Sequence, residues 1–211
     1  MTRSFSLRTA LLAAVMIAAP ASAASNLIVN GGFENTGFGG TGSYYNLGNS
    51  GADHAVPGDF GFAVTLNDVD LIANGVYAPF LATGGAYNLD LNGYNTGAIG
   101  QTFATQLGRA YRVSIDYSQN GGGKSAVVNV NGSGIGTLIG SGSWQNFTTT
   151  FAGTGAPTVF DITSIVGSSG GITLDNISVS DVPEPATWAM MLTGFGMLGF
   201  AMRKRQKTVA A

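Results

Sequence analysis

The feature that most constrains the fold is a period of two in the placement of apolar side chains. In the run 111–117 every second residue is apolar, and in the run 147–151 Phe147, Thr149 and Phe151 alternate with two further threonines. Such alternation is typical of strands with one face in a core and the other in solvent. Further candidate strands cover 27–29, 60–66, 86–91, 98–103, 126–130, 159–165 and 172–179. About nine short strands at this spacing predict an all-β sandwich.

Glycine and asparagine separate the candidate strands and disfavour helix between them. The chain holds 33 glycines, and glycine is unfavourable inside a helix. The pairs Asn92-Gly93 and Asn131-Gly132 are typical of tight turns. The stretch 35–58 is rich in Gly, Asn, Ser and Tyr, and we expect a long functional or disordered loop there.

The first 23 residues have the three parts of a secretory signal peptide. Arg3 and Arg8 precede an apolar run over 9–19, and Ala21-Ser22-Ala23 offers small residues for cleavage. We expect residues 1–23 to be removed, so that the mature chain begins at Ala24. An uncleaved N-terminal anchor is the alternative.

The other end of the chain carries an apolar run followed by basic residues. The run 186–202 is uncharged and lies near the lower limit of the roughly 17–25 residues that cross a bilayer. The basic tail 203–207 follows at once, and Lys and Arg favour the cytoplasmic side. The pattern predicts a transmembrane helix over about 186–202, with everything before Pro183 outside.

A short motif precedes this predicted helix and makes the end more specific than a plain anchor. The residues that carry it are Pro183, Glu184, Pro185, Trp188, Ala189, Arg203, Lys204 and Arg205. In that order, the segment 182–211 resembles the PEP-CTERM sorting signal, in the subclass with Trp-Ala after Pro-Glu-Pro. The resemblance implies recognition by a membrane-embedded exosortase, cleavage near the motif, and release or transfer to the cell surface. Such proteins occur in bacteria that make extracellular polysaccharide.

Charge and cysteine usage exclude several classes of function for residues 24–181. This part has three basic and ten acidic residues, a net charge of −7. A nucleic-acid-binding surface needs clustered Lys and Arg, which this part lacks. The chain has no cysteine, so neither disulfides nor thiolate zinc sites are expected.

No catalytic residues are predicted. The chain has a single histidine, His54, and Glu34 is the one glutamate of residues 24–181. A serine–histidine–aspartate site would have to use His54, which we expect to be a solvated loop residue. A polysaccharide hydrolase would need two acids across one cleft. The conceivable partners of Glu34 are Asp59, Asp68, Asp70 and Asp90, and nothing in the sequence pairs them.

The part between the targeting segments resembles a known family of secreted domains. The matching segments are 26–34, 89–93, 97–105, 108–113 and 174–179. The first looks like the opening of galactose-binding-like jelly rolls, including carbohydrate-binding modules. In this order, the segments resemble the choice-of-anchor C family, which is related to a plant cell-wall family. The resemblance implies a jelly-roll β-sandwich over 24–181 without established enzymatic activity.

One carboxylate pair is a candidate metal site. The apolar positions of 172–179 change parity at Asp175-Asn176, which predicts a β-bulge that re-aims a side chain. In jelly rolls of the kind resembled, the opening Glu and an Asp of the last strand often hold a structural calcium, here Glu34 and Asp175. Calcium prefers six to eight oxygen ligands. The alternative is that both carboxylates accept hydrogen bonds from nearby backbone amides.

Exposed aromatic rings are the candidate sugar-binding groups, because the apolar faces of sugars stack on them. Tyr44, Tyr45 and Tyr94 lie in expected loops. Trp144 begins an expected strand, and we expect it to pack in the core. The function predicted is a secreted, exosortase-sorted surface or matrix protein that binds or associates with extracellular polysaccharide. The alternative is a purely structural or adhesive matrix protein without a small ligand.

Overall fold

The computed structural model describes residues 25–38, 43–48, 52–76, 81–167, 169–182 and 191–199. The chain forms two compact units, one of residues 24–182 and one that combines 1–23 with 183–211. The signal peptide and all the predicted sorting residues lie outside the described residues.

The described part of the second unit is a helix over 191–199. The expected transmembrane helix, about 186–202, extends past the described residues at both ends. Among the described residues, no helix is both long and apolar enough to cross a membrane.

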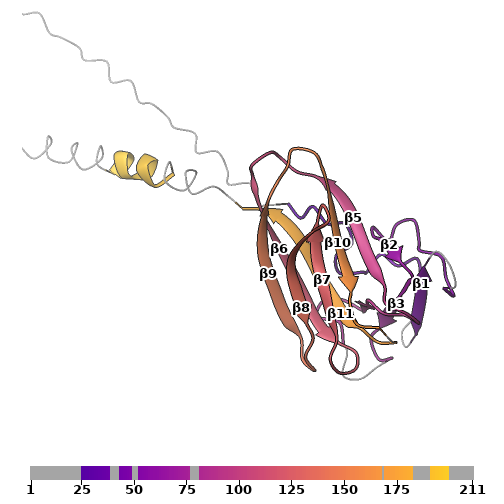
Figure 1. Cartoon of the computed structure of the whole chain (residues 1–211). Helices are drawn as coiled ribbons and strands as arrows, with labels where there is room; N and C mark the ends of the chain where they lie inside the picture. The colour runs from indigo at the N-terminus through magenta and orange to yellow at the C-terminus, as the bar shows by residue number, and fades with distance from the viewer. Residues whose placement is uncertain are drawn as a thin grey trace, which may run out of the picture. The chain divides into compact units, whose positions relative to one another are not determined.

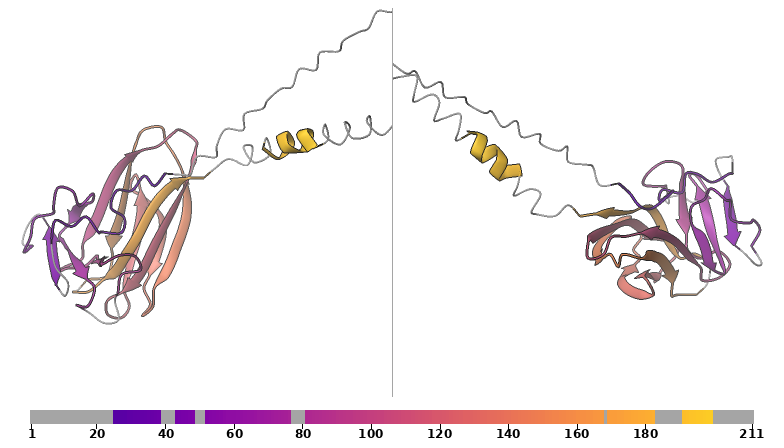
Figure 2. Two further views of the ribbon diagram at one scale, coloured as in Figure 1. Left: turned by 180° about the vertical axis from the view of Figure 1, so that it is seen from behind. Right: turned by 90° about the horizontal axis from the view of Figure 1, so that it is seen from above.

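Residues 24–182 form two antiparallel sheets (Figures 1 and 2). The strands are β1 (Tyr44–Gly48), β2 (Ala63–Leu66), β3 (Asp68–Ala73), β4 (Tyr87–Asp90), β5 (Ala98–Ala104), β6 (Ala110–Gln119), β7 (Ser125–Val130), β8 (Ser133–Ile139), β9 (Gln145–Ala152), β10 (Pro157–Ser164) and β11 (Ile172–Asp181). The six-stranded sheet has the order β1-β3-β4-β11-β6-β9, and the five-stranded sheet β2-β5-β10-β7-β8. From β4 on, the chain crosses repeatedly between the sheets, as in a jelly roll. The predicted all-β jelly-roll sandwich is confirmed.

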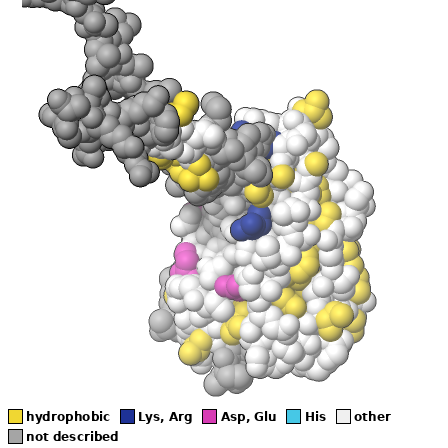
Figure 3. Space-filling model, turned by 90° about the vertical axis from the view of Figure 1, so that its left-hand side faces the viewer, with side chains coloured by type: hydrophobic (Ala, Val, Ile, Leu, Met, Phe, Trp, Pro, Cys, Tyr) yellow, Lys and Arg dark blue, Asp and Glu magenta, His cyan; other side chains and the backbone are white. Residues whose placement is uncertain are grey.

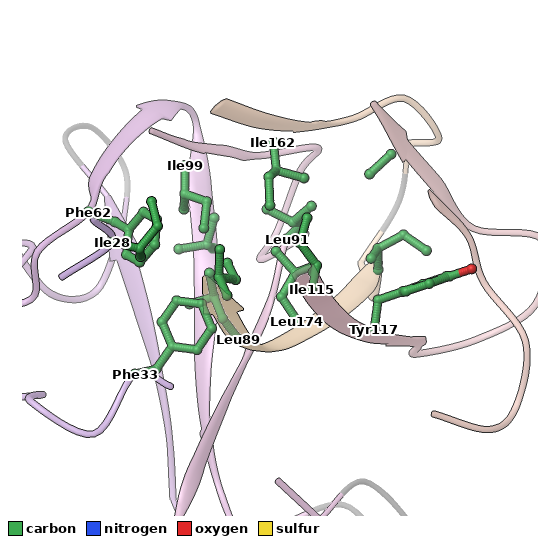
Figure 4. Close-up of a cluster of buried hydrophobic side chains, with 14 of the residues drawn as sticks. Ile28, Phe33, Phe62, Leu89, Leu91, Ile99, Ile115, Tyr117, Ile162 and Leu174 are labelled. Carbon is green, nitrogen blue, oxygen red and sulfur yellow. The ribbon is translucent and has the colours of Figure 1, made fainter. Parts of the chain in front are cut away.

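The core lies between the two sheets, as the alternation requires. Leu89, Ile115 and Leu174 reach it from the six-stranded sheet, and Ile99 and Ile162 from the five-stranded sheet (Figure 4). All five side chains are fully buried. The core cluster and both sheets lie within residues 24–182, so this unit has what an independently folding domain needs.

The opening segment is held on the last strand rather than forming a strand of its own, so the expected strand at 27–29 is wrong. Leu27 donates its N–H to the carbonyl of Val179 at 2.7 Å, and Ile177 donates to the carbonyl of Gly31 at 2.8 Å. A Cβ at Gly31 would lie 1.9 Å from the Ile177 oxygen. Only glycine fits this approach, which brings the opening segment onto β11.

Two further predictions from the sequence concern the loop at 35–58 and the bulge at Asp175-Asn176. The stretch 35–58 is not entirely loop, because β1 (Tyr44–Gly48) lies within it and pairs with β3. The predicted bulge is confirmed: the register of β11 against β6 shifts between Asp175 and Ser178. Asn176 takes a φ of 46° there, in the left-handed region that asparagine tolerates better than most residues.

Candidate functional site

Glu34 and Asp175, the predicted metal pair, both accept hydrogen bonds from backbone N–H groups. The Oε1 atom of Glu34 accepts from the N–H groups of Ala86 and Tyr87 at 2.8 and 2.9 Å. Glu34 is exposed, and its carboxylate links the opening segment to the start of β4 at the surface of the domain.

Asp175 is fully buried and more heavily bonded. Its Oδ2 atom accepts from the N–H of Thr83 at 2.6 Å, the hydroxyl of Thr83 at 3.0 Å and the N–H of Gly84 at 3.0 Å. Its Oδ1 atom accepts from the N–H of Asn176 at 2.7 Å. Burial raises the pKa of Asp175, and these hydrogen bonds oppose the rise.

This donor set fits a hydrogen-bonded anchor better than a calcium site. Calcium needs oxygen ligands, whereas N–H groups surround both Asp175 oxygens. The described residues contain no group of three or more His, Cys, Asp or Glu side chains placed to hold a metal. The bulge therefore aims Asp175 at the amides of 83–84, and the calcium ion stays a prediction.

Replacing Asp175 with alanine should lower the melting temperature of the domain, because it leaves the Thr83 and Gly84 amides without an acceptor. Each unsatisfied buried group costs about 1–3 kcal/mol, and about 1 kcal/mol corresponds to roughly 2–4 °C at this size. Calorimetry should show a fall of several degrees, and Asp59→Ala, at an exposed aspartate, should show almost none. An unchanged wild-type value in chelator would support the hydrogen-bonded anchor. A reversible fall of several degrees in chelator would instead support calcium.

A row of polar residues that the sequence did not single out crosses the outer face of the six-stranded sheet. Asn46 pairs with Asp70, Asp70 with Asp90, and Asp90 with Thr173 in successive strands. Asn46, Asp90 and Thr173 are each 1% exposed or less. The signal in the sequence was the alternation of aspartate with Val69 and Leu71, which gives β3 one acidic face.

Hydrogen bonds within the chain hold the carboxylates of this row and that of the neighbouring Asp68. The amide of Asn46 donates at 2.7 Å to both Asp68 and Asp70. Asp90 accepts from the N–H of Asn92 at 2.9 Å and from the side-chain amide of Asn120 at 3.0 Å. Burial raises the pKa of Asp90 to about 7, and burial also raises that of Asp70.

Two of the three predicted tyrosines stand at the rim of this row. Tyr44 is 43% exposed and Tyr94 is 54% exposed. The Tyr94 hydroxyl donates to Asp53 at 2.8 Å, and this bond is the main cause that raises the pKa of Tyr94 to about 12. Tyr44 lies two residues before Asn46 on β1, and the Asn46 amide joins Asp70 to Asp68, which accepts the N–H of Tyr94. Tyr44, Asp53, Asp70 and Tyr94 together are called the tyrosine–aspartate patch below.

Tyr45 is placed differently from the other two tyrosines. It is half-buried, and its ring stacks on Phe38 with centroids 4.2 Å apart and planes 11° apart. His54 packs edge-on against Tyr45 at 5.6 Å and is exposed, as expected of a solvated loop residue. The face of Tyr45 toward Phe38 is therefore covered.

The expectation that Trp144 packs in the core is wrong. The residue is only partly buried, and β9 begins after it, at Gln145. Its indole N–H donates to the carbonyl of Leu81 at 3.0 Å, which holds the ring against the loop before β4. The polar edge of indole favours this surface position over the core.

A shallow groove of about 510 Å³ lies on the other sheet. Its lining residues are Gly61, Ala63, Thr65, Gly100, Gln101, Thr102, Val159 and Asp161. None of them is aromatic, so this groove offers no ring on which a sugar could stack.

Comparisons with solved structures return carbohydrate-binding modules. A family 61 module in complex with β-1,4-galactotriose is 15% identical with a TM-score of 0.48, covering 75% of this chain and 99% of its own. A family 16 module is 21% identical with a TM-score of 0.47, covering 73% and 99%. A family 35 module from Clostridium thermocellum is 19% identical with a TM-score of 0.41, covering 56% and 90%. At these scores the fold assignment rests on the strand order itself.

No curated protein matches the chain. A family model does match one segment, namely the PEP-CTERM protein-sorting motif at residues 181–206. The matched segment contains Pro183-Glu184-Pro185, Trp188-Ala189 and the basic residues Arg203-Lys204-Arg205. The end of this chain is a PEP-CTERM sorting motif.

Proposed function

We propose that this chain is a secreted, exosortase-processed surface protein whose sandwich binds extracellular polysaccharide through the tyrosine–aspartate patch. The observation that carries the proposal is the exposure of Tyr44 and Tyr94 around a hydrogen-bonded group of carboxylates that includes Asp53 and Asp70. An exposed ring offers an apolar surface to the C–H face of a sugar. Neighbouring carboxylates can accept hydrogen bonds from its hydroxyls.

The route to the surface follows from the two ends of the chain. The signal peptide at 1–23 directs export, and the run 186–202 holds the chain in the membrane until an exosortase acts at Pro183-Glu184-Pro185. The sandwich is then released or transferred to the cell surface. The family model at 181–206 supports this route.

Rigid placement of Tyr94 strengthens the patch as a binding surface. Its hydroxyl is fixed by Asp53, and its N–H donates to Asp68 at 2.5 Å. A ring that is already held in place loses little conformational freedom when a ligand stacks on it. The net charge of −7 for 24–181 suits a neutral glycan better than an anionic one.

Glycan-array and titration binding of purified residues 24–182 tests the proposal. Tyr94→Ala and Tyr44→Ala should each weaken binding about tenfold, because roughly 1.4 kcal/mol of ring stacking is lost. Tyr94→Phe should retain most of the affinity, since the ring remains. Leu107→Ala is the matched control, at an apolar side chain that is 81% exposed outside the patch.

Two results would contradict this assignment. Equal affinity of the tyrosine variants and the wild type would place the glycan elsewhere, with the groove at Asp161 as the next surface to test. Absence of binding to every glycan would favour the alternative of a purely structural or adhesive matrix protein.

A polysaccharide hydrolase is less well supported. Two of the acids that such an enzyme could use are engaged within the fold, and the first, Glu34, accepts two backbone N–H groups. Asp68 accepts from Asn46 and from the N–H of Tyr94. Both carboxylates therefore already serve as hydrogen-bond acceptors within the fold.

A further inference from the structure

The outermost strand of the six-stranded sheet has the features of a pairing edge. β9 pairs with β6 on one side and is last in the sheet order. Its eight residues pair with β6 without a register shift. An edge strand presents backbone N–H and C=O groups to any strand that can align with it, and proteins usually block such edges with charge, proline or bulges.

None of those protective devices occurs in β9. Its sequence, QNFTTTFA, has no charged residue and no proline. The edges on the other side of the sandwich are less suitable for pairing: β1 has five residues, and β2 has four with a register shift between Val64 and Leu66. The remaining edge strand, β8, has seven residues, and its pairing with β7 shifts register between Val128 and Asn129, so β9 is the longest regular edge among the described strands.

Absence of charge extends well beyond β9. The stretch 125–160 contains no Asp, Glu, Lys, Arg or His, and it supplies β7, β8, β9 and the first half of β10. Figure 3 looks onto the side where β9 lies in Figure 1 and shows charged side chains only in small patches. Two copies with a net charge of −7 repel each other over most surfaces, but this edge adds no like charges to the encounter.

The order of residues in β9 fits one partner in particular. The segment Phe147-Thr148-Thr149-Thr150-Phe151 reads the same in both directions. In an antiparallel pair with its own copy, centred on Thr149, Phe147 lies opposite Phe151 and Thr148 opposite Thr150. Aromatic pairs and Thr–Thr pairs are favourable cross-strand neighbours, and a two-fold interface brings the same patch of both copies together.

We propose that the sandwich pairs with a second copy of itself through β9, antiparallel about a two-fold axis at Thr149. The two six-stranded sheets then continue into one another. Phe147 and Phe151, which are partly buried against their own core, gain cover from the rings of the partner. The side chains of Thr148 and Thr150, which are exposed on the outer face, meet their counterparts.

Disulfide trapping in purified 24–182 tests the register directly, because the chain has no native cysteine. Opposite residues of an antiparallel pair have Cα atoms roughly 4.5–5.5 Å apart, within the range that a disulfide spans. Thr149→Cys should give a covalent dimer on mild oxidation. Thr150→Cys, the matched control, lies opposite Thr148 of the partner and should give almost none. Equal trapping of the two variants, or none of either, would overturn the proposed register.

Sedimentation over a concentration series tests the pairing without a crosslink. The double variant Thr148→Lys/Thr150→Lys places Lys opposite Lys twice and should weaken dimerisation about tenfold or more. The control is Ala63→Lys/Thr65→Lys, which adds the same charge at exposed positions of β2 and should dimerise like the wild type. Mixing the β9 Lys variant with Thr148→Glu/Thr150→Glu should restore dimers, which also shows that both variants fold.

The proposal fails if the wild type is monomeric throughout the series, or if both Lys variants dimerise equally. It is independent of the glycan site, because the β9 variants leave Tyr44 and Tyr94 in place. Loss of dimers with retained glycan binding, or the reverse, separates the two proposals.

Discussion

Replacing Pro183, Glu184 and Pro185 with alanine is expected to leave a full-length protein in the membrane fraction and almost none at the cell surface. The reason is that the variant keeps the apolar run 186–202 and its basic tail but loses the residues expected to be recognised for cleavage. Immunoblots of membrane, surface and medium fractions measure the distribution. Mass spectrometry of the wild-type surface protein should find a C-terminus near Val182.

The control for this experiment is a neighbouring alanine substitution. Thr187→Ala lies between the Pro-Glu-Pro motif and Trp188 and should be processed like the wild type. Mature surface protein with an intact tail to Ala211 would rule out cleavage at the motif. Normal processing of the triple variant would show that recognition depends on other residues of 181–206.

The second large effect concerns pH. Burial raises the pKa of Asp90 from 3.8 to about 7, so the folded domain holds a proton between about pH 4 and pH 7 that the unfolded chain releases. Stability from this group is therefore fully present below about pH 4 and is lost as the pH rises through about 7. We expect a loss of roughly 2–4 kcal/mol in unfolding free energy over this range. The melting temperature should fall by roughly 5–15 °C.

Asp90→Asn tests the assignment, because it keeps the shape of the neutral acid and cannot ionise. Calorimetry or circular dichroism across the pH range should show a flatter profile for the variant and higher stability than the wild type near pH 8. Asp59→Asn, at an exposed aspartate, should keep the wild-type profile. A wild-type domain that becomes more stable from pH 4 to pH 8 would contradict the buried-acid account.

The alternation of apolar and polar residues predicted most of the strands, because this pattern can be recognised within the sequence of each strand alone. The runs at 111–117 and 147–151 became β6 and β9, and the change of parity at Asp175-Asn176 marked the bulge. These features depend on which face of a strand is buried, and a local pattern records that directly.

The strands that local patterns missed are stabilised by residues that are distant in the sequence. Aspartate is depleted in strands, yet β3 places Asp68 and Asp70 where the amide of Asn46 bonds both. Asn46 comes from β1, which lies in a stretch whose glycines and asparagines suggested a loop. Strand β8 has two glycines in seven residues, and its pairing with β7 compensates for their low strand propensity.

The candidate site was only partly predictable, because its residues also depend on partners that are distant in the sequence. The exposed tyrosines could be named from composition and position, but the partner of Tyr94 could not, because Asp53 lies 41 residues away. That Glu34 and Asp175 could accept hydrogen bonds from backbone N–H groups could be proposed from the sequence, because carboxylates commonly do so. Its donors, at Thr83 and Ala86, could be located only in the folded chain.

The central position of the last strand has a mechanical consequence for a protein displayed at a surface. β11 ends at Asp181 and lies between β4 and β6, pairing with β6 along most of its length. A pull on the chain at Val182 acts along this strand. Its hydrogen bonds to both neighbours then bear the load together in shear, whereas a terminal edge strand would peel away one bond at a time.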